Sequence, residues 1–333
     1  MMPFKKKCAK KQTRIRVLFA VLLCFALMIL LTPGCIRRVI IPKFPNKLTL
    51  NTLSLQQTIH VKFHGIDHQV ALDVVASVNH AMNVMKQWGT LTTPITIRIF
   101  PSHGSLEEAV LRRYKWLRAW ALYNEVYLQS PRTWNIKYYQ SDLLELLTHE
   151  LTHVVMYQLC CQQQSWFKRP IPFWFREGMA SYTAHQGYRR YKKLLPEFLR
   201  KPIGKKVLQR PSRHLHRHQG MAYSIAHWMF VDFIKKWKLK GARQLLEMMR
   251  TGKTFDGAFQ KITGMTNKTF KKRFMEYESS RIAGRSIFRK QRLSKSTQPS
   301  SATKGKMGLC ALHDSPRAKG TQEQPSTSDS TWR

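Results

Sequence analysis

The sequence predicts an α+β fold, in which a small mixed β-sheet with helices is followed by a mostly helical half. Two observations support this prediction. Before residue 130, several short segments alternate apolar and polar residues, as half-buried strands do. After residue 140, apolar residues instead recur every three or four positions, as on the buried face of a helix. The sequence has no internal repeat, so we do not expect a repeat architecture.

The first half of the patterned region predicts strands and helices in turn. The segments QTIHVKF at 57–63 and PITIRIF at 94–100 alternate as strands do. Valines and methionines at helical spacing predict a helix over 67–88, and residues 104–115 are also expected to be helical. The aromatic and β-branched segment LRAWALYNEVYLQS at 117–130 predicts a hairpin or two short strands.

The second half predicts a series of helices. SDLLELLTHELTHVVMYQL at 141–159 begins with residues that cap helices well. A loop rich in helix breakers follows, and Pro172 suits the first turn of the next helix, FWFREGMASYTAHQ at 173–186. Further helices are expected at 221–237, 242–252 and 266–281.

The first 35 residues have the composition of an export signal. Basic residues precede an uncharged run at 17–31, VLFAVLLCFALMILL, and TPGC follows it. The run is shorter than the roughly 20 residues of a full membrane span. TPGC resembles the end of a bacterial lipoprotein signal, in which Cys35 would be lipidated. A lipoprotein, an uncleaved membrane anchor and an ordinary cleaved signal all stay open, and each places the remainder outside the cytoplasm.

The flanks of the folded region are basic. Residues 36–55 contain Pro42 and Pro45 and predict a tether, while the Ser-, Thr- and Lys-rich residues 282–333 predict a disordered basic tail. Residues 56–281 are expected to form the folded domain. The formal net charge is +39, from 57 Lys+Arg against 18 Asp+Glu. This balance suggests attraction to anionic surfaces, although a solvated basic surface would give the same number.

Several classes of protein lack support in the sequence. The six cysteines show no CxxC spacing, which argues against a disulfide framework and a cysteine zinc site. No RNP, zinc-finger or helix-turn-helix signature accompanies the charge, so no specific nucleic-acid partner is expected. The segment HLHRH at 214–218 predicts an exposed basic loop, with a separate metal site or a contact to anionic lipid as alternatives.

The segment THELTH at 148–153 places a glutamate between two histidines. His149 and His153 lie four residues apart, so on a helix they share one face and can bind one zinc ion. Glu150 lies beside them, where a carboxylate can take a proton from a water molecule that the metal activates. A catalytic zinc site needs a third protein ligand. The next acidic residue is Glu177, and a helix, a turn and an antiparallel helix would bring it back to the metal.

Two segments carry a resemblance to a known family. LLTHELTHVV followed by PFWFREGMASY resembles the gluzincin zinc metallopeptidases, in the broad peptidase MA-like group. Their pattern is HExxH, a loop, and then W-x-x-E-G-x-A, which Trp174, Glu177, Gly178 and Ala180 match in place. Gly178 is expected to keep the helix surface beside the glutamate open. The resemblance covers about residues 56–280, and the G-x-M-E-N segment of the aminopeptidase branch is absent.

The resemblance implies a zincin-like domain and a site for Zn²⁺. His149, His153 and Glu177 would be the zinc ligands, and Glu150 would be the general base for hydrolysis of a peptide or protein substrate. The segment LYNEVYL at 122–128 is implied as an edge strand that holds extended peptide. Together with the N-terminus, this predicts an exported, membrane-associated metallopeptidase.

Two roles in the site stay open. A Tyr or His should face the negative charge that develops on the substrate oxygen, and Tyr223 is preferred over His227 and Tyr182. Each of the three is otherwise an aromatic residue of the core. Glu145 or Asp142 would orient the first histidine of the motif, or would simply stabilise the start of the helix.

Other functions also stay open. The fold could be retained without catalysis, as an inactive zincin-fold lipoprotein that binds a partner. The charge alone would fit an exported protein that binds polyanions. The histidines of the motif could also stand on a surface helix by chance.

Overall fold

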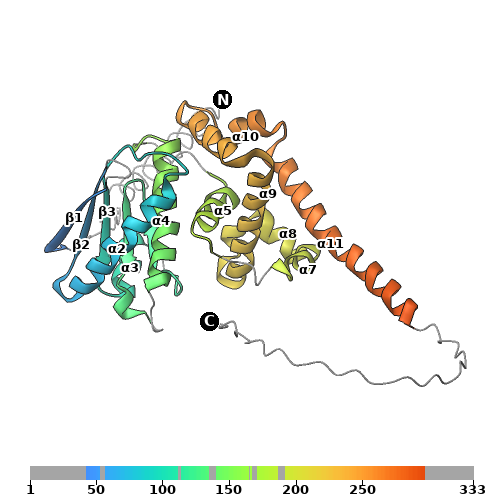
Figure 1. Cartoon of the computed structure of the whole chain (residues 1–333), viewed down its shortest axis with the longest axis horizontal. Coiled ribbons are helices and arrows are strands. Elements are labelled where there is room, and N and C mark those ends of the chain that lie inside the picture. The colour runs from blue at the N-terminus through green and yellow to red at the C-terminus, as the bar shows by residue number, and fades with distance from the viewer. Residues whose placement is uncertain are drawn as a thin grey trace, which may run out of the picture. The chain divides into compact units, whose positions relative to one another are not determined.

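The structure is a computed structural model and describes residues 43–52, 57–111, 114–134, 140–164, 166, 171–186 and 192–296. The chain divides into two compact units with a boundary after Arg285, and the first unit contains the sheet and the helices around it (Figure 1). The predicted export segment, with Cys35, lies outside the described residues. Among the helices that are described, none combines the length and the apolar character that crossing a membrane requires.

A five-stranded mixed sheet forms the first half, with the strand order β1-β2-β3-β5-β4. The central strand β3 (Ile95–Phe100) runs parallel to both of its neighbours, β2 (Gln57–Phe63) and β5 (Glu125–Gln129). The outer strands β1 (Asn46–Thr52) and β4 (Ala119–Ala121) pair antiparallel with β2 and β5. The predicted small mixed sheet is therefore confirmed, and β4 is one of its edges.

Two helices accompany these strands. α2 (His68–Met85) connects β2 to β3 and packs its valines and methionines against β2 and against α4 (Gln140–Cys160). α3 (His103–Val110) ends at Leu111, whose backbone is left-handed with a φ of 53°. A left-handed residue cannot continue a right-handed helix, so α3 is shorter than the helix predicted at 104–115.

The second half is helical, as predicted (Figure 1). α4 carries the HExxH segment, and α5 (Phe173–Thr183) carries Glu177. α9 (Leu215–Arg250) packs along α5 and also contacts α4. The remaining helices are α7 (Leu195–Arg200), α8 (Pro202–Gln209), α10 (Phe255–Thr263) and α11 (Asn267–Ser296), with 3₁₀ turns η1 (Gly65–Asp67), η2 (Pro131–Thr133) and η4 (Pro211–Arg213).

An aromatic cluster fixes α5 against α9 and α10. Phe175 packs edge-on against Phe230 and Phe233, with ring centroids 5.3 and 5.8 Å apart, and Trp174 contacts Phe259 at 5.9 Å. All five rings are almost fully buried, and each contributes roughly 1.5–3 kcal/mol by leaving water. Residues two apart on a helix differ by about 200° in direction. Because Phe175 faces α9, the residue two positions later faces the opposite side, toward α4.

Two predicted boundaries are wrong. Strand β1 falls within residues 36–55, which were predicted as a tether, and it pairs with β2 along its whole length. Its leucines alternate with polar residues and are only half-buried, so a short edge strand in a basic segment gave little signal. Helix α11 continues to Ser296, so residues 282–296 of the predicted disordered tail are helical. Residues 297–333 lie outside the described part.

The helices expected at 221–237 and 242–252 are confirmed as two parts of α9, which non-helical backbone at Lys238, with a φ of 58°, separates. One other prediction within the helical half is corrected. The HLHRH segment at 214–218 is not an exposed loop. His214 is the N-cap residue of α9, and residues 215–217 form a helical turn that non-helical backbone at His218 separates from the rest of α9; His216 and Arg217 are exposed.

Candidate metal centre

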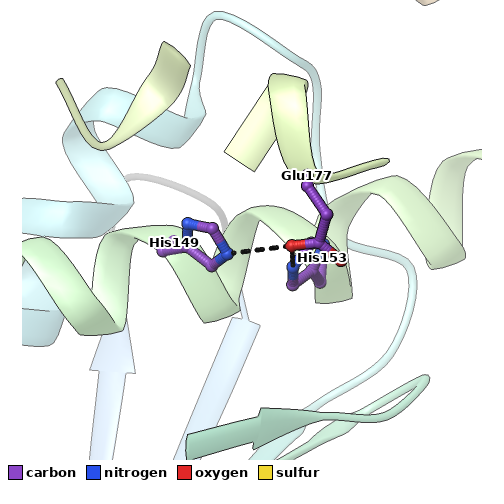
Figure 2. A group of neighbouring side chains, drawn as sticks. All are labelled: His149, His153 and Glu177. Atoms are coloured by element: carbon purple, nitrogen blue, oxygen red, sulfur yellow. Dashed lines mark ion pairs between the residues drawn. The ribbon is translucent and has the colours of Figure 1, made fainter. Parts of the chain in front are cut away.

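Three buried side chains from two helices converge on one point (Figure 2). His149 and His153 project from the same face of α4, and Glu177 reaches them from α5. The Oε2 atom of Glu177 lies 3.4 Å from Nε2 of His149 and 3.4 Å from Nε2 of His153. One donor atom of each residue lies within 4.8 Å of the other two. The sequence predicted these three residues, and the structure brings them together.

The spacing of these atoms suits a metal ion better than direct ion pairs. A charge-assisted N–H···O bond is about 2.7–2.9 Å long, shorter than the 3.4 Å observed twice here. Donors about 2.0–2.1 Å from a tetrahedral zinc ion lie about 3.3–3.5 Å apart, from the geometry of the tetrahedron. Two imidazoles and a carboxylate are also the donor set of one class of catalytic zinc site. The residues present therefore fit a zinc ion.

The close packing of α5 on α9 sets the position of Glu177. A Cβ atom at Gly178 would overlap the backbone oxygen of Ala226 and the Cβ of Phe230. Gly178 therefore does not keep a surface open, as predicted, but allows two helices to approach each other closely. Glu177 immediately precedes Gly178, so this contact between α5 and α9 also fixes the distance of Glu177 from α4.

Arg176 holds the second oxygen of the Glu177 carboxylate. The Arg176 Nε donates to Oε1 of Glu177 at 2.9 Å, which leaves Oε2 directed at the histidines. Burial alone would raise the pKa of Glu177, but the charges of His153 and Arg176 hold it well below its usual range. The Glu177 side chain is only 8% exposed, so its partners are these side chains and not bulk water. Sequence reasoning did not assign a role to Arg176.

Gln186 orients His149. Its Oε1 lies 2.8 Å from Nδ1 of His149 and can only accept, so Nδ1 donates to Gln186 and Nε2 is the ring nitrogen directed at Glu177. Gln186 follows α5 directly, where the left-handed backbone of His185, with a φ of 53°, turns the chain back. Glu145 acts on His149 through its charge and hydrogen-bonds to Gln186. Glu145 therefore belongs to the surroundings of His149, and the sequence missed the glutamine between them.

His153 lies against an aromatic side chain. Its ring stacks on Tyr157, one turn further along α4, with centroids 6.2 Å apart and an interplanar angle of 18°. Tyr157 in turn contacts Trp166 at 4.9 Å. Nδ1 of His153 is buried without a hydrogen-bond partner among the described residues. A buried polar nitrogen without a partner is costly, so the other ring nitrogen, Nε2, which faces Glu177, is the atom of His153 that would bind an ion.

Glu150 lies between the metal ligands and the edge of the sheet. It is buried, and this burial raises the pKa of its carboxyl group even though His149 and His153 act in the opposite direction. The backbone N–H of Ala121, at the end of β4, donates to its carboxylate. Glu150 is therefore held beside the two histidines, as a general base requires.

The edge strand nearest the site is β4 and not LYNEVYL at 122–128. Most of that segment is β5, which is paired on both sides. In β4 the backbones of Arg118 and Leu122 bond to β5, so those of Ala119 and Ala121, at the alternate positions, face outward. The prediction failed because a hairpin pattern does not say which of its two strands has a second neighbour.

Four aromatic side chains are candidates to face a substrate oxygen. Tyr223 of α9 packs against Phe173 at 5.6 Å, and its hydroxyl acts electrostatically on Arg176. Tyr157, which the sequence did not suggest, is partly buried and acts electrostatically with Arg176 and both site glutamates. The other two candidates have partners of their own. The His227 ring hydrogen-bonds with the hydroxyl of Ser181 at 2.8 Å. The Tyr182 ring packs against Phe230, with centroids 5.7 Å apart.

Comparison with known proteins does not identify a family for this chain. Neither the models of known protein families nor the curated proteins match this chain. The resemblance to gluzincins therefore rests on the two sequence segments, and the candidate site rests on the geometry of its own side chains.

Proposed function

We propose that this protein is a zinc-dependent metallopeptidase of the gluzincin type, exported and held at a membrane by its N-terminus. One observation carries the proposal. The buried donor atoms of His149, His153 and Glu177 lie within 4.8 Å of one another, the two histidine–Glu177 separations of 3.4 Å match tetrahedral zinc ligands, and the carboxylate of Glu150 lies beside them.

When bound, the zinc ion would activate a water molecule and polarise the carbonyl group of the substrate. The protein supplies the remaining parts of the reaction. Glu150 takes the proton of the attacking water and passes it to the leaving amine. Tyr223, or Tyr157 on α4, donates to the oxygen that becomes negative. Gln186 and Arg176 keep His149 and Glu177 in position and do not touch the substrate.

The outer edge of β4 supports a peptide as the substrate. The backbone groups of Ala119 and Ala121 point away from β5, and those that are not used by the bond from Ala121 to Glu150 could pair with an extended chain. Ala121 also donates to Glu150, so a peptide on this edge would pass directly beside the general base. This arrangement favours an endopeptidase or exopeptidase over a hydrolase for small, compact molecules.

The test of this function separates metal binding from catalysis. Glu150→Gln keeps the shape of the side chain but removes the base, so it should retain zinc and lose about 10²–10⁴-fold in turnover of an unfolded protein substrate. Glu247→Gln is the matched control, because Glu247 is exposed on α9 away from the site. Full activity of the Glu150→Gln protein would contradict the mechanism. Absence of chelator-sensitive cleavage in the native protein would favour an inactive, partner-binding fold.

A further inference from the structure

A second cavity, separate from the metal centre, lies where α5, α8, η4, α9 and α11 meet. Its volume is about 350 Å³. It is lined by residues of these five elements, and none of them comes from α4 or belongs to the metal group. The size lies in the range of pockets that hold small organic ligands.

Three cationic side chains line this cavity, and they come from different places in the chain. Arg210 follows α8, Arg213 ends η4, and Lys271 belongs to α11. No acidic residue is among the lining residues. Among the described residues, no carboxylate lies within ion-pair distance of any of the three, although Asp256 acts on Lys271 from further away. Three basic residues around one cavity without a paired carboxylate favour an anionic ligand there.

The remaining walls add a second positive element and an apolar surface. The first turn of α5, at Phe173 and Trp174, forms one wall, and the dipole of that 11-residue helix places positive potential there. Leu208 and Ile225 are buried and supply apolar surface beside the cations. A ligand that matches the cavity therefore has an anionic group and an apolar part.

We propose that this cavity binds a phosphate ester with an apolar body, held by Arg210, Arg213 and Lys271. Guanidinium groups match the oxygens of phosphate with paired hydrogen bonds, and two arginines are among the residues that line this cavity. Two sources supply this chemistry: the phosphodiester headgroup of an anionic lipid, and a soluble phosphomonoester. The site adds a ligand to the protein and does not depend on the proposed peptidase activity.

Calorimetric titration of the full chain in a non-ionic detergent tests the proposal. Phenyl phosphate represents the soluble monoester, and dihexanoyl phosphatidylglycerol, a short-chain lipid, represents the lipid phosphodiester with its apolar part. The double variant Arg210→Gln/Arg213→Gln should weaken binding of the preferred probe at least about tenfold, because charge-assisted hydrogen bonds are lost. Both arginines are exposed, so the variant should fold normally.

The control removes the same charge from the same region. Lys205 and Lys206 are exposed on α8 but do not line the cavity, so Lys205→Gln/Lys206→Gln should change affinity less than about twofold at 0.15 M salt. Glu177→Gln should also leave the affinity unchanged, which separates this site from the metal centre. Binding of either probe with this pattern supports the proposal and identifies the source. Binding of neither probe, or equal losses in the two double variants, would overturn it.

Discussion

Replacing Gln186 with methionine tests how the protein orients its first histidine. The Gln186→Met variant keeps the length of the side chain but removes the oxygen that accepts from Nδ1 of His149. That hydrogen bond is 2.8 Å long. The His149 side chain is only 7% exposed, so water has little access to replace the lost acceptor. The imidazole would then lose the partner that fixes its tautomer and its direction.

The expected loss follows from this single contact. Removing a group that orients a metal-ligating histidine costs about 10–100-fold in metal affinity, which corresponds to about 1.4–2.7 kcal/mol. Because the histidine is buried, we expect a value near the upper end of that range. Competition between the protein and a zinc-binding indicator measures the affinity, and circular dichroism checks that the variant is folded.

A matched glutamine variant gives the baseline. Gln69 is exposed on α2 and bonds only to Asp73 on the same helix, at 3.1 Å, so Gln69→Met should bind zinc as the native protein does. If Gln186→Met kept native zinc affinity, His149 would not need its partner, and the reasoning from the 2.8 Å contact would be refuted.

Three further predictions concern the surroundings of the site. Gly178→Ala should lower the free energy of unfolding by at least about 1–3 kcal/mol in urea titrations. The overlap of the new methyl group with α9 outweighs the gain of about 1 kcal/mol that alanine brings in helix propensity. An unchanged urea midpoint would contradict the close approach of the two helices. Arg176→Met should weaken zinc binding about tenfold by freeing the Glu177 carboxylate, whereas equal affinity would show that Arg176 has no positioning role. Tyr223→Phe should keep zinc and lower kcat about 10²-fold, and if Tyr157→Phe shows that loss instead, the oxyanion partner lies on α4.

The main elements and the three donor residues were predictable because their signals are local. Strands β2 and β3 alternate strictly, and α4 and α5 carry apolar residues at helical spacing. The HExxH spacing places His149 and His153 on one helical face, and Glu177 was the next acid along the chain. For the strands, the helices and the two histidines, a short window of sequence contains the whole physical cause, whereas Glu177 was found as the next acid and its position depends on how α5 packs.

The residues that support the donors were not predictable, because their roles depend on tertiary geometry. Gln186 reaches His149 only because the backbone turns at His185, which is left-handed without being a glycine. Tyr157 lies on the motif's own helix, yet nothing in its spacing distinguishes a residue beside the site from one in the core. Gly178 was predicted to keep the helix surface beside Glu177 open, but it is the point where α5 contacts α9 closely. Sequence alone does not say which helix lies opposite a glycine.

Segments with mixed or weak patterns were also beyond sequence reasoning. The residues of strand β1 are only partly buried because the strand lies at a sheet edge, so its alternating pattern is weak. The basic, proline-containing composition of the segment predicted a tether instead. The edge position of β4 depends on which strand pairs with β5 from the other side, and that pairing brings together distant parts of the chain.

The central claim is that one zinc ion is held by two imidazoles and one carboxylate from separate helices. Zinc-edge X-ray absorption on the purified protein, with metal content measured alongside, tests it most directly. We predict one zinc per chain with two imidazole ligands and oxygen donors at about 2.0–2.2 Å, and loss of that zinc in Glu177→Gln. A native protein that binds no zinc, or a Glu177→Gln protein that binds it equally well, would contradict the account.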